Sequence, residues 1–367
     1  MHLEFDVSSC IRATSKFSEC TKCVDICPVS TIEMLDNTPA FTPSACINCG
    51  GCVGICPTES FSLSGFSPIE FFFKFLEEEN NELVCQQDLY CCLSVLSVEH
   101  LISLAVASET PVIMDAKGCH CGGESTLLKE QIIANIEEAN FILSSFSDKK
   151  ILIKSVVATS LKKEEEQKVT DRRSFLSLKG AIKSKQAFDE AVVADELKSF
   201  GIDTAVIAGI RDKKIPDKRK LLYSVLKRVP KPLSYDVLAS KDISFTSQKF
   251  IDESCTNCQI CYRICPTGAL SSNGKFSVIN FDAMMCLKCH LCHDVCEPNA
   301  IQLQQGFEIK EFFEPTQRTL ATFDIKRCNE CGNYFTYTGG LKECLRCKSE
   351  EEEAMELHAN ARRMKLE

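Results

Sequence analysis

The middle of the chain contains short stretches whose apolar positions recur with helical or strand-like periods. Apolar residues spaced three and four apart predict helices, whereas short apolar runs bounded by polar residues predict strands. Residues 67–160 contain both kinds in alternation, so we expect a small β-α-β-α domain there. The expected helices are Glu70–Glu78, Val98–Ser108 and Leu127–Glu138, and the expected strands are Leu89–Cys92 and Val112–Asp115.

Residues 161–245 are rich in charge and predict a helical connector. The segment opens with the charged run Lys162–Lys168, contains one α-β step at Ala194–Ile207, and ends in a basic helix, Asp217–Arg228. The prolines that follow stop this helix because proline lacks a backbone N–H. The basic residues of Lys213–Lys220 favour a solvated helix face, with a docking patch for an acidic partner as the alternative.

Cysteine is the residue type whose abundance is unusual. The chain has 25 cysteines among 367 residues and no tryptophan. They come in tight C-x-x-C groups separated by cysteine-poor stretches, which is typical of metal sites and not of a small disulfide framework. Residues 8–63 and 250–305 repeat the same pair of motifs, so the sequence predicts two related metal-binding modules, one near each end.

The second of these stretches contains two complete cysteine runs. Each run has the spacing C-x2-C-x2-C-x3-C, which resembles that of bacterial ferredoxins with two [4Fe–4S] clusters. In such ferredoxins the fourth cysteine of each run binds the cluster of the other run. The resemblance therefore implies one cluster on Cys255, Cys258, Cys261 and Cys296, and another on Cys286, Cys289, Cys292 and Cys265.

The first stretch is less regular. Its second run is complete, but its first run has Phe17 where the first ligand is expected. Phenylalanine cannot bind iron, so either this cluster is absent or reduced to three irons, or another thiolate replaces the ligand. Cys10 is the candidate replacement, because the nine-residue loop between it and Cys20 costs little to close. We expect one cluster on Cys10, Cys20, Cys23 and Cys56, and the other on Cys46, Cys49, Cys52 and Cys27.

Five further cysteines lie in the middle domain: Cys85, Cys91, Cys92, Cys119 and Cys121. The last two belong to a glycine-rich loop, Gly118–Gly123, that follows a predicted strand, where α/β sheets place their sites. They predict a fifth metal site, such as a [2Fe–2S] cluster, or a reversible dithiol, and the alternative is that some are buried small apolar side chains. Alternation along a strand points Cys91 and Cys92 to opposite faces, and the sequence does not choose between them.

Four cysteines near the C-terminus form two C-x2-C pairs: Cys328, Cys331, Cys344 and Cys347. Two such pairs across a short hairpin predict a tetrahedral, zinc-ribbon-like site, and a rubredoxin-like iron site is the alternative. A closed site with four thiolate ligands leaves no open position for chemistry, so we expect a structural role. A charged helical tail, Ser349–Glu367, follows this site.

Charge and hydropathy exclude several classes of function. The net charge of −9 argues against a nucleic-acid partner, because binding the phosphate backbone needs a basic surface. The sequence contains no nucleotide or flavin motif. It has no apolar run near the roughly 18 residues of a membrane span, and its N-terminus does not resemble a secretory signal. Thiolate ligands must stay reduced until a cluster is inserted, so we expect a cytoplasmic protein.

The order of these parts resembles bacterial 4Fe–4S dicluster-domain proteins associated with molybdopterin formate dehydrogenases. The shared features are an irregular and a regular cysteine run, the glycine–cysteine loop, an internal Arg172-Arg173 pair, the basic helix, a complete pair of runs and the C-terminal knuckle. The loop Gly118–Gly123 also resembles, more distantly, the small iron–sulfur subunit that links hydrogenase to heterodisulfide reductase. Both resemblances imply electron transfer to or from a large oxidoreductase.

We therefore expect an α+β protein in which two bacterial-type ferredoxin modules flank a small α/β domain, with a four-cysteine knuckle at the end. The expected units are residues 1–66, 67–160, 161–245, 246–310 and 311–367.

The expected function is the passage of single electrons to or from a partner oxidoreductase, suggested by resemblance to be a formate dehydrogenase, with no catalysis on this chain. The expected cofactors are four [4Fe–4S] clusters and one zinc, with a further iron–sulfur cluster in the middle domain as a candidate. Two alternatives are an accessory protein that matures a molybdenum or iron–sulfur enzyme, and a dithiol/disulfide redox enzyme that uses the middle cysteines.

Overall fold

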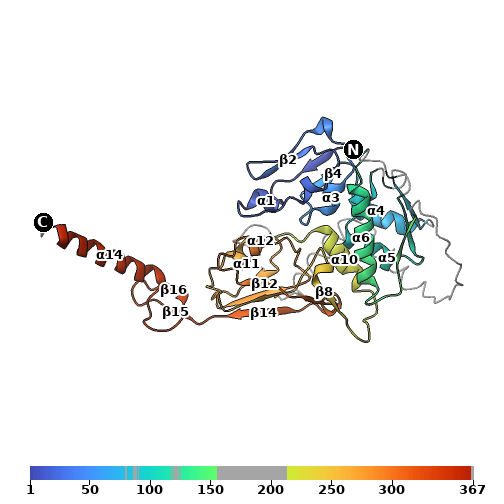
Figure 1. Cartoon of the computed structure of the whole chain (residues 1–367). Coiled ribbons are helices and arrows are strands. Elements are labelled where there is room, and N and C mark those ends of the chain that lie inside the picture. The colour runs from blue at the N-terminus through green and yellow to red at the C-terminus, as the bar shows by residue number, and fades with distance from the viewer. Residues whose placement is uncertain are drawn as a thin grey trace.

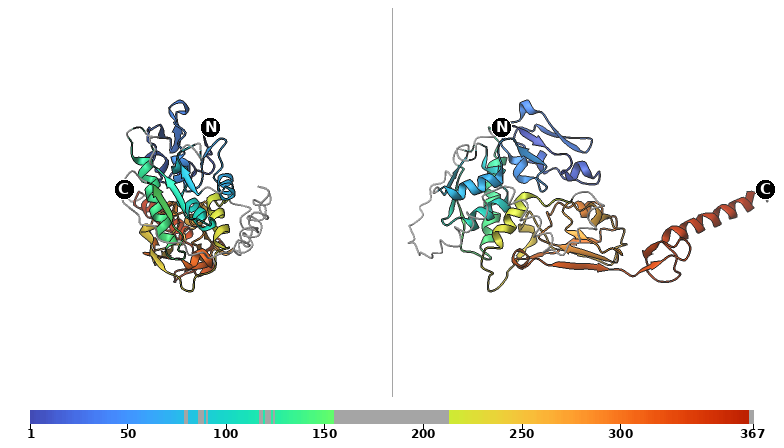
Figure 2. Two further views of the ribbon diagram at one scale, coloured as in Figure 1. Left: turned by 90° about the vertical axis from the view of Figure 1, so that its right-hand side faces the viewer. Right: turned by 180° about the vertical axis from the view of Figure 1, so that it is seen from behind.

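The computed structural model describes residues 1–78, 81–85, 89, 91–116, 119, 123, 125–154 and 213–364. Four features of the sequence lie outside these residues: the run Lys162–Lys168, the Arg172-Arg173 pair, the step Ala194–Ile207, and Cys121. We call residues 1–66 module 1, residues 67–154 the middle domain and residues 237–322 module 2. Figure 1 shows module 1 (blue), the middle domain (cyan to green) and module 2 (orange) packed together, and Figure 2 shows them from two further sides.

Module 1 consists of two short antiparallel strand pairs with short helices between them. Strand β1 (Leu3–Phe5) pairs with β4 (Phe61–Leu63), so the two ends of the module meet, and the rings of Phe5 and Phe61 lie 4.8 Å apart. Leu3 lies opposite Leu63 in this pair of strands, and both side chains are buried in the core. The other elements are α1 (Ile11–Thr14), α2 (Lys22–Asp25), β2 (Ile32–Leu35), β3 (Thr38–Phe41), the 3₁₀ helix η1 (Pro43–Ala45) and α3 (Gly51–Ile55), with β2 and β3 paired as a hairpin.

The middle domain contains a parallel three-stranded sheet in the order β5-β6-β7. The Ser67 hydroxyl caps the first helix by accepting the Glu70 N–H, and Ser97 and His100 form a capping box at the start of α5. The strand and the three helices predicted from apolar periodicity are confirmed, and α6 continues five residues beyond Glu138. The elements are α4 (Pro68–Glu77), β5 (Glu82–Val84), η2 (Leu93–Val95), α5 (Val98–Ala107), β6 (Val112–Asp115), α6 (Leu127–Leu143) and β7 (Ile151–Lys154).

The strand predicted at Leu89–Cys92 is wrong. The strand on that side of the sheet is β5, and Cys92 is the residue that precedes η2. The Cys92 N–H donates to the Cys49 carbonyl of module 1 at 3.1 Å, so this backbone joins two domains and does not add to the sheet. The packing is close here: a Cβ at Gly54 in α3 would lie 2.1 Å from the Ser94 carbonyl oxygen in η2.

Module 2 contains a pair of strands that corresponds to β1 and β4 of module 1. It also includes strands from the residues before and after the expected module. Strand β9 (Lys249–Ile251) pairs with β12 (Ile301–Leu303), as β1 pairs with β4 in module 1. Strands β8 (Val237–Ala239) and β14 (Gln317–Thr322) lie outside residues 246–310, yet they pair with β13 and β11, so the folded unit extends beyond the expected boundaries. The remaining elements are η3 (Ser240–Asp242), α11 (Ile260–Ile264), β10 (Leu270–Ser271), β11 (Val278–Asp282), α12 (Leu291–Asp294), β13 (Gly306–Glu308) and α13 (Lys310–Phe313).

The C-terminal segment is a hairpin followed by a helix that extends away from the rest of the chain (Figure 1). Strands β15 (Ile325–Arg327) and β16 (Tyr334–Thr336) form the hairpin, and α14 (Leu345–Met364) is the helix. The Asn257 side-chain amide of module 2 donates to the Thr336 hydroxyl at 3.0 Å. None of the helices in the described part of the chain is both long and apolar enough to cross a membrane.

Helix α10 (Asp217–Leu226) lies between the two modules and packs against α5 and α4. The expectation of a solvated basic face is wrong for Lys218 and Arg219, which are only 4% and 2% exposed. They are buried because polar groups of three domains surround them, as described below. A single cluster of buried apolar side chains runs through module 1, the middle domain, α10 and module 2.

Candidate metal centres

The first group of thiols in module 1 is Cys10, Cys20, Cys23 and Cys56. Burial raises the pKa of Cys23 to about 12, with the charges of Cys56, Cys20 and Cys10 acting in the same direction. Cys10 comes from outside the cysteine runs, as the residue that precedes α1. Phe17, which occupies the position of the expected ligand, is 55% exposed. The structure thus brings Cys10 to the position that the sequence leaves empty.

The second group in module 1 is Cys27, Cys46, Cys49 and Cys52. Burial raises the pKa of Cys49 to about 11, and the charges of Cys92, Cys27 and Cys46 add to this effect. Burial also raises the pKa of Cys52, and both Cys46 of this group and Cys23 of the first group contribute. The two groups are therefore immediate neighbours.

Module 2 holds two further groups of four thiols. Burial raises the pKa of both Cys261 and Cys292 to about 12. The charge of Cys261 also acts on Cys292, so these two groups are neighbours as in module 1. Cys258 is exposed, which places the first of the two groups near the surface. Their members are Cys255, Cys258, Cys261 and Cys296, and Cys265, Cys286, Cys289 and Cys292.

Three of the four cysteine runs have the same backbone conformation, with positive φ at the second and fourth residues after the first cysteine. Alternation of right- and left-handed residues directs successive N–H groups into a concave nest, a feature of many iron–sulfur sites. Left-handed conformations are costly for residues other than glycine, so this repeated strain is a feature of the site. The residues are Asn48 (54°), Gly50 (82°), Asn257 (55°), Gln259 (71°), Lys288 (47°) and His290 (63°).

The fourth run lacks this conformation. Thr21, the fourth residue after Phe17, has a φ of −124°. The run that has Phe17 in place of a cysteine thus follows a different backbone path. Cys10 and α1 form the N-terminal side of this group. The sequence signal for this change was the phenylalanine itself.

Several hydrogen bonds point at the sulfur atoms. The backbone N–H groups of Thr31, Ser60 and Lys288 donate to Cys27, Cys56 and Cys286 at 3.4, 3.3 and 3.4 Å. The Ser247 hydroxyl lies 3.4 Å from the Cys286 sulfur, and sequence reasoning missed it because 39 residues separate the two. Converging thiols, nests of N–H groups and donors to sulfur together fit the requirements of a thiolate-bound iron–sulfur cluster.

Three of the five candidate cysteines in the middle domain lie together: Cys85, Cys92 and Cys119. Cys85 follows β5 and Cys119 follows β6, at the carboxyl edge of the parallel sheet. Hydrogen bonds with Cys119 and Cys85 lower the pKa of Cys92. The structure thus brings Cys92 to the other two thiols. Cys121 lies outside the described residues.

The four C-terminal cysteines have all their sulfur atoms within 4.8 Å of one another: Cys328, Cys331, Cys344 and Cys347. The hairpin β15–β16 carries the first pair, and the second pair lies at the start of α14. The backbone N–H groups of Cys331 and Cys344 lower the pKa of Cys328 to about 6. The Cys331 and Cys344 sulfurs are 3.7 Å apart, a spacing that suits two ligands of one tetrahedral ion.

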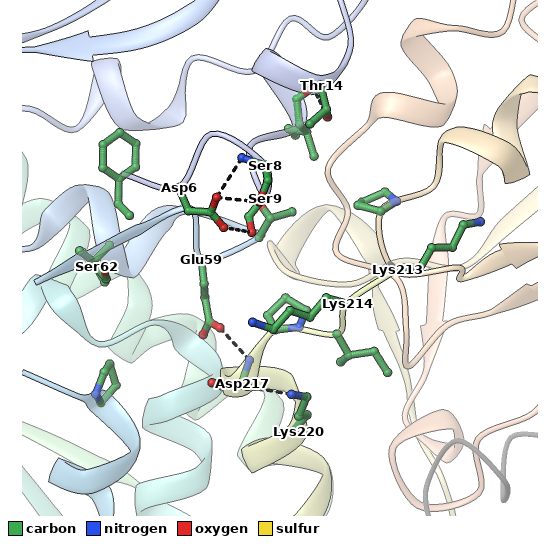
Figure 3. A pocket seen from close by; sticks show the side chains of 18 of the residues that line it. Asp6, Ser8, Ser9, Thr14, Glu59, Ser62, Lys213, Lys214, Asp217 and Lys220 are labelled. Carbon is green, nitrogen blue, oxygen red and sulfur yellow. Dashed lines mark hydrogen bonds and ion pairs between the residues drawn. The ribbon is translucent and has the colours of Figure 1, made fainter. Parts of the chain in front are cut away.

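A cavity of about 1230 Å³ lies where module 1, module 2 and the start of α10 meet (Figure 3). Its walls carry basic side chains, among them Lys213, Lys214 and Lys220. Carboxylates also line it, among them those of Asp6, Glu59 and Asp217. Glu59 accepts the backbone N–H groups of Asp217 and Lys218, which ties module 1 to α10.

Comparison with known families agrees with this geometry. The 4Fe–4S dicluster domain matches the chain twice, over residues 18–60 and 254–300. The first match begins after both Cys10 and Phe17, where the sequence departs from the regular pattern. No curated protein and no solved structure matches the chain. The chain thus contains two ferredoxin-type regions that match a 4Fe–4S dicluster domain, and together they cover less than half of its length.

The position of Cys10 predicts the result of a pair of substitutions. Cys10→Ala removes a thiol from the first group, and we expect the loss of up to about four irons per chain, because a [4Fe–4S] cluster needs a full set of ligands. Phe17→Ala changes an exposed side chain and leaves the iron content unchanged. Iron and labile sulfide are measured on anaerobically purified protein. Equal iron in Cys10→Ala and the parent protein would show that Cys10 is not a ligand.

Proposed function

We propose that this chain passes single electrons to or from a partner oxidoreductase through four [4Fe–4S] clusters. The observation that carries the proposal is the assembly of sixteen thiols into four groups inside two regions that match a 4Fe–4S dicluster domain or border on one. The proposed ligand sets are Cys10, Cys20, Cys23 and Cys56; Cys27, Cys46, Cys49 and Cys52; Cys255, Cys258, Cys261 and Cys296; and Cys265, Cys286, Cys289 and Cys292.

The protein's own contribution is to hold and tune these clusters. When bound, they supply one-electron chemistry over a range of roughly −700 to +450 mV, depending on burial, charge and hydrogen bonds to sulfur. Each of the four groups contains at least one buried thiol, which limits the access of water. The donors to Cys27, Cys56 and Cys286 stabilise negative charge on sulfur. The neighbouring groups within each module suit transfer over short steps, and no bond of a substrate needs to be broken on this chain.

We propose a formate dehydrogenase of the molybdopterin type as the partner, in the cytoplasm. The order of the parts along the sequence supports this partner through the resemblance described above. The exposed Cys258, next to the C-terminal hairpin, offers a group of thiols near the surface where an electron can enter or leave. The rival function is the maturation of such an enzyme, in which the chain binds only the cofactor-free form.

Purification of the tagged chain from its own host under anaerobic conditions distinguishes these two functions. We expect a stoichiometric amount of a mature, cofactor-loaded dehydrogenase in the eluate, measured by mass spectrometry together with molybdenum analysis. The Cys258→Ser variant separates binding of the partner from electron transfer. We expect it to recover the same amount of partner but to transfer electrons more slowly. Recovery of cofactor-free enzyme and chaperones alone would replace the electron-transfer proposal by maturation.

We propose that the four C-terminal cysteines bind one structural zinc. Their compact sulfur arrangement suits a tetrahedral ion, and Cys328 and Cys344 are the only buried apolar residues in the described part of their segment. We predict about one zinc per chain, lost in Cys344→Ala with iron content unchanged, as measured by elemental analysis. Iron in place of zinc at this site would make it rubredoxin-like and assign it a redox role.

A specific observation also favours a fifth centre, on Cys85, Cys92 and Cys119. These thiols interact with one another, and the Cys92 backbone is bonded to Cys49, a proposed ligand of the nearest cluster. We propose a thiolate-bound iron site here that exchanges electrons with that cluster. The alternative is a dithiol/disulfide pair formed by two of the three thiols.

Substitution of Cys92 tests this site. We expect Cys92→Ser to lose one or two irons relative to the parent protein, because the substitution removes a proposed ligand. Iron content and Mössbauer spectra report the result. Unchanged iron in Cys92→Ser, with two fewer free thiols after oxidation of the parent protein, would favour the dithiol.

A further inference from the structure

Two buried cations of α10 each contact the backbone of a proposed cluster ligand, one in each module. The Lys218 ammonium donates to the Cys56 carbonyl oxygen in module 1. The Arg219 guanidinium donates to the Cys286 carbonyl oxygen in module 2 at 2.8 Å, and also to the Met284 carbonyl. Consecutive residues of one helix thus connect the two ferredoxin modules at their ligands.

Lys218 is the less closely paired of these two cations. Arg219 Nε lies 2.5 Å from Glu99 Oε1, while Lys218 Nζ lies 3.9 Å from the other oxygen of the same carboxylate. Glu59 also faces Lys218, but it accepts two backbone N–H groups and burial raises its pKa. Burial lowers the pKa of the nearby His100 to about 3, so its ring adds no charge at neutral pH. Asp282, whose pKa burial raises to about 6, also interacts with Arg219. Burying a charge is unfavourable unless it is paired, so further negative charge beside α10 would stabilise Lys218.

The thiol groups that contain Cys56 and Cys286 each have one member, Cys20 and Cys289 respectively, at a contact between the modules. A separate apolar cluster, Ile11, Leu291 and Val295, joins α1 to α12, with Cys20 and Cys289 packed against it. The Glu19 N–H approaches the Asp294 carboxylate at 3.4 Å in the same region. A thiolate-bound cluster with its ligands carries net negative charge, so two clusters at this junction would add negative charge beside these cations.

We propose that Lys218 and Arg219 form a cationic bridge that positions these two clusters for transfer between the modules and makes their reduction potentials less negative. In this step one cluster gives up one electron and is oxidised, the other accepts it and is reduced, and no bond forms or breaks. A fixed positive charge favours the reduced form, which carries one more negative charge. The inference rests on the proposed electron-transfer function and assigns its inter-module step.

The test uses the full chain with its clusters, titrated with reductant and followed by electron paramagnetic resonance. Lys218→Met removes one cation but leaves Glu99 paired with Arg219. We expect a more negative potential for the cluster nearest Cys56, identified as the one that Cys10→Ala loses. Lys220→Met is the matched control on the same helix, because Lys220 pairs with Asp217 and not with a cluster ligand.

Two further variants separate charge from structure. Lys218→Arg restores the charge, and we expect the potential to return toward that of the parent protein. Glu99→Gln keeps the shape of the side chain but removes the compensating anion, so we expect both junction clusters to become easier to reduce. If Lys218 and Glu99 had only a structural role, Lys218→Met and Glu99→Gln would not shift the reduction potentials in opposite directions.

The outcomes distinguish this inference from the proposed function. Full iron and sulfide content with unchanged potentials in both Lys218→Met and Glu99→Gln would overturn the cationic bridge and leave the electron-transfer function intact. A parent protein without iron and labile sulfide would instead overturn the proposed function. If Lys218→Met does not fold, the Glu99→Gln potentials decide alone, since a shift toward easier reduction supports the bridge and its absence refutes it.

Discussion

The packing of the domains depends on how one guanidinium group is solvated by protein. Arg219 is almost inaccessible to water, and a buried charge is stable only where acceptors replace the lost water. Those acceptors are the Glu99 carboxylate of the middle domain and the carbonyl oxygens of Phe245, Met284 and Cys286. Because they belong to the middle domain and to module 2, the helix that carries Arg219 cannot leave its position without exposing unpaired charge and unpaired carbonyls.

The modules are consequently parts of one packed body. Apolar residues from both modules, the middle domain and α10 form one cluster, and Gly54 allows α3 to approach η2 more closely than any residue with a side chain would. Such packing holds groups of thiols at fixed separations, as electron transfer between clusters requires. The C-terminal hairpin differs, because its cysteines lie outside this core and form a compact group of their own.

The middle domain does more than connect the modules. Its parallel sheet ends in Cys85 and Cys119, and Cys92 lies between them and the second thiol group of module 1. Its helix α5 supplies Glu99 to the cations of α10. The domain therefore contacts the proposed clusters in two ways, through thiols at one edge of its sheet and through a carboxylate on its helix.

The cysteine runs, the irregularity at Phe17, strand β6 and helices α4, α5 and α6 were readable from the sequence. Each depends on residues close together in the chain, because a cluster motif spans about a dozen residues and helical periodicity repeats every 3.6. The false strand at Leu89–Cys92 shows the limit of that approach, since an apolar run that packs against another domain has the same pattern as a buried strand.

Only the tertiary structure decided which distant groups meet. Sequence spacing made Cys10 a candidate, and folding of α1 brings it to Cys56; likewise folding brings Cys92 to Cys85 and Cys119. The sequence predicts a solvated face for Lys218 and Arg219, because no local pattern indicates their partner Glu99, which lies about 120 residues away. Contacts over such separations are determined by packing of the whole chain, whereas the ligand motifs are determined by the short loops that contain them.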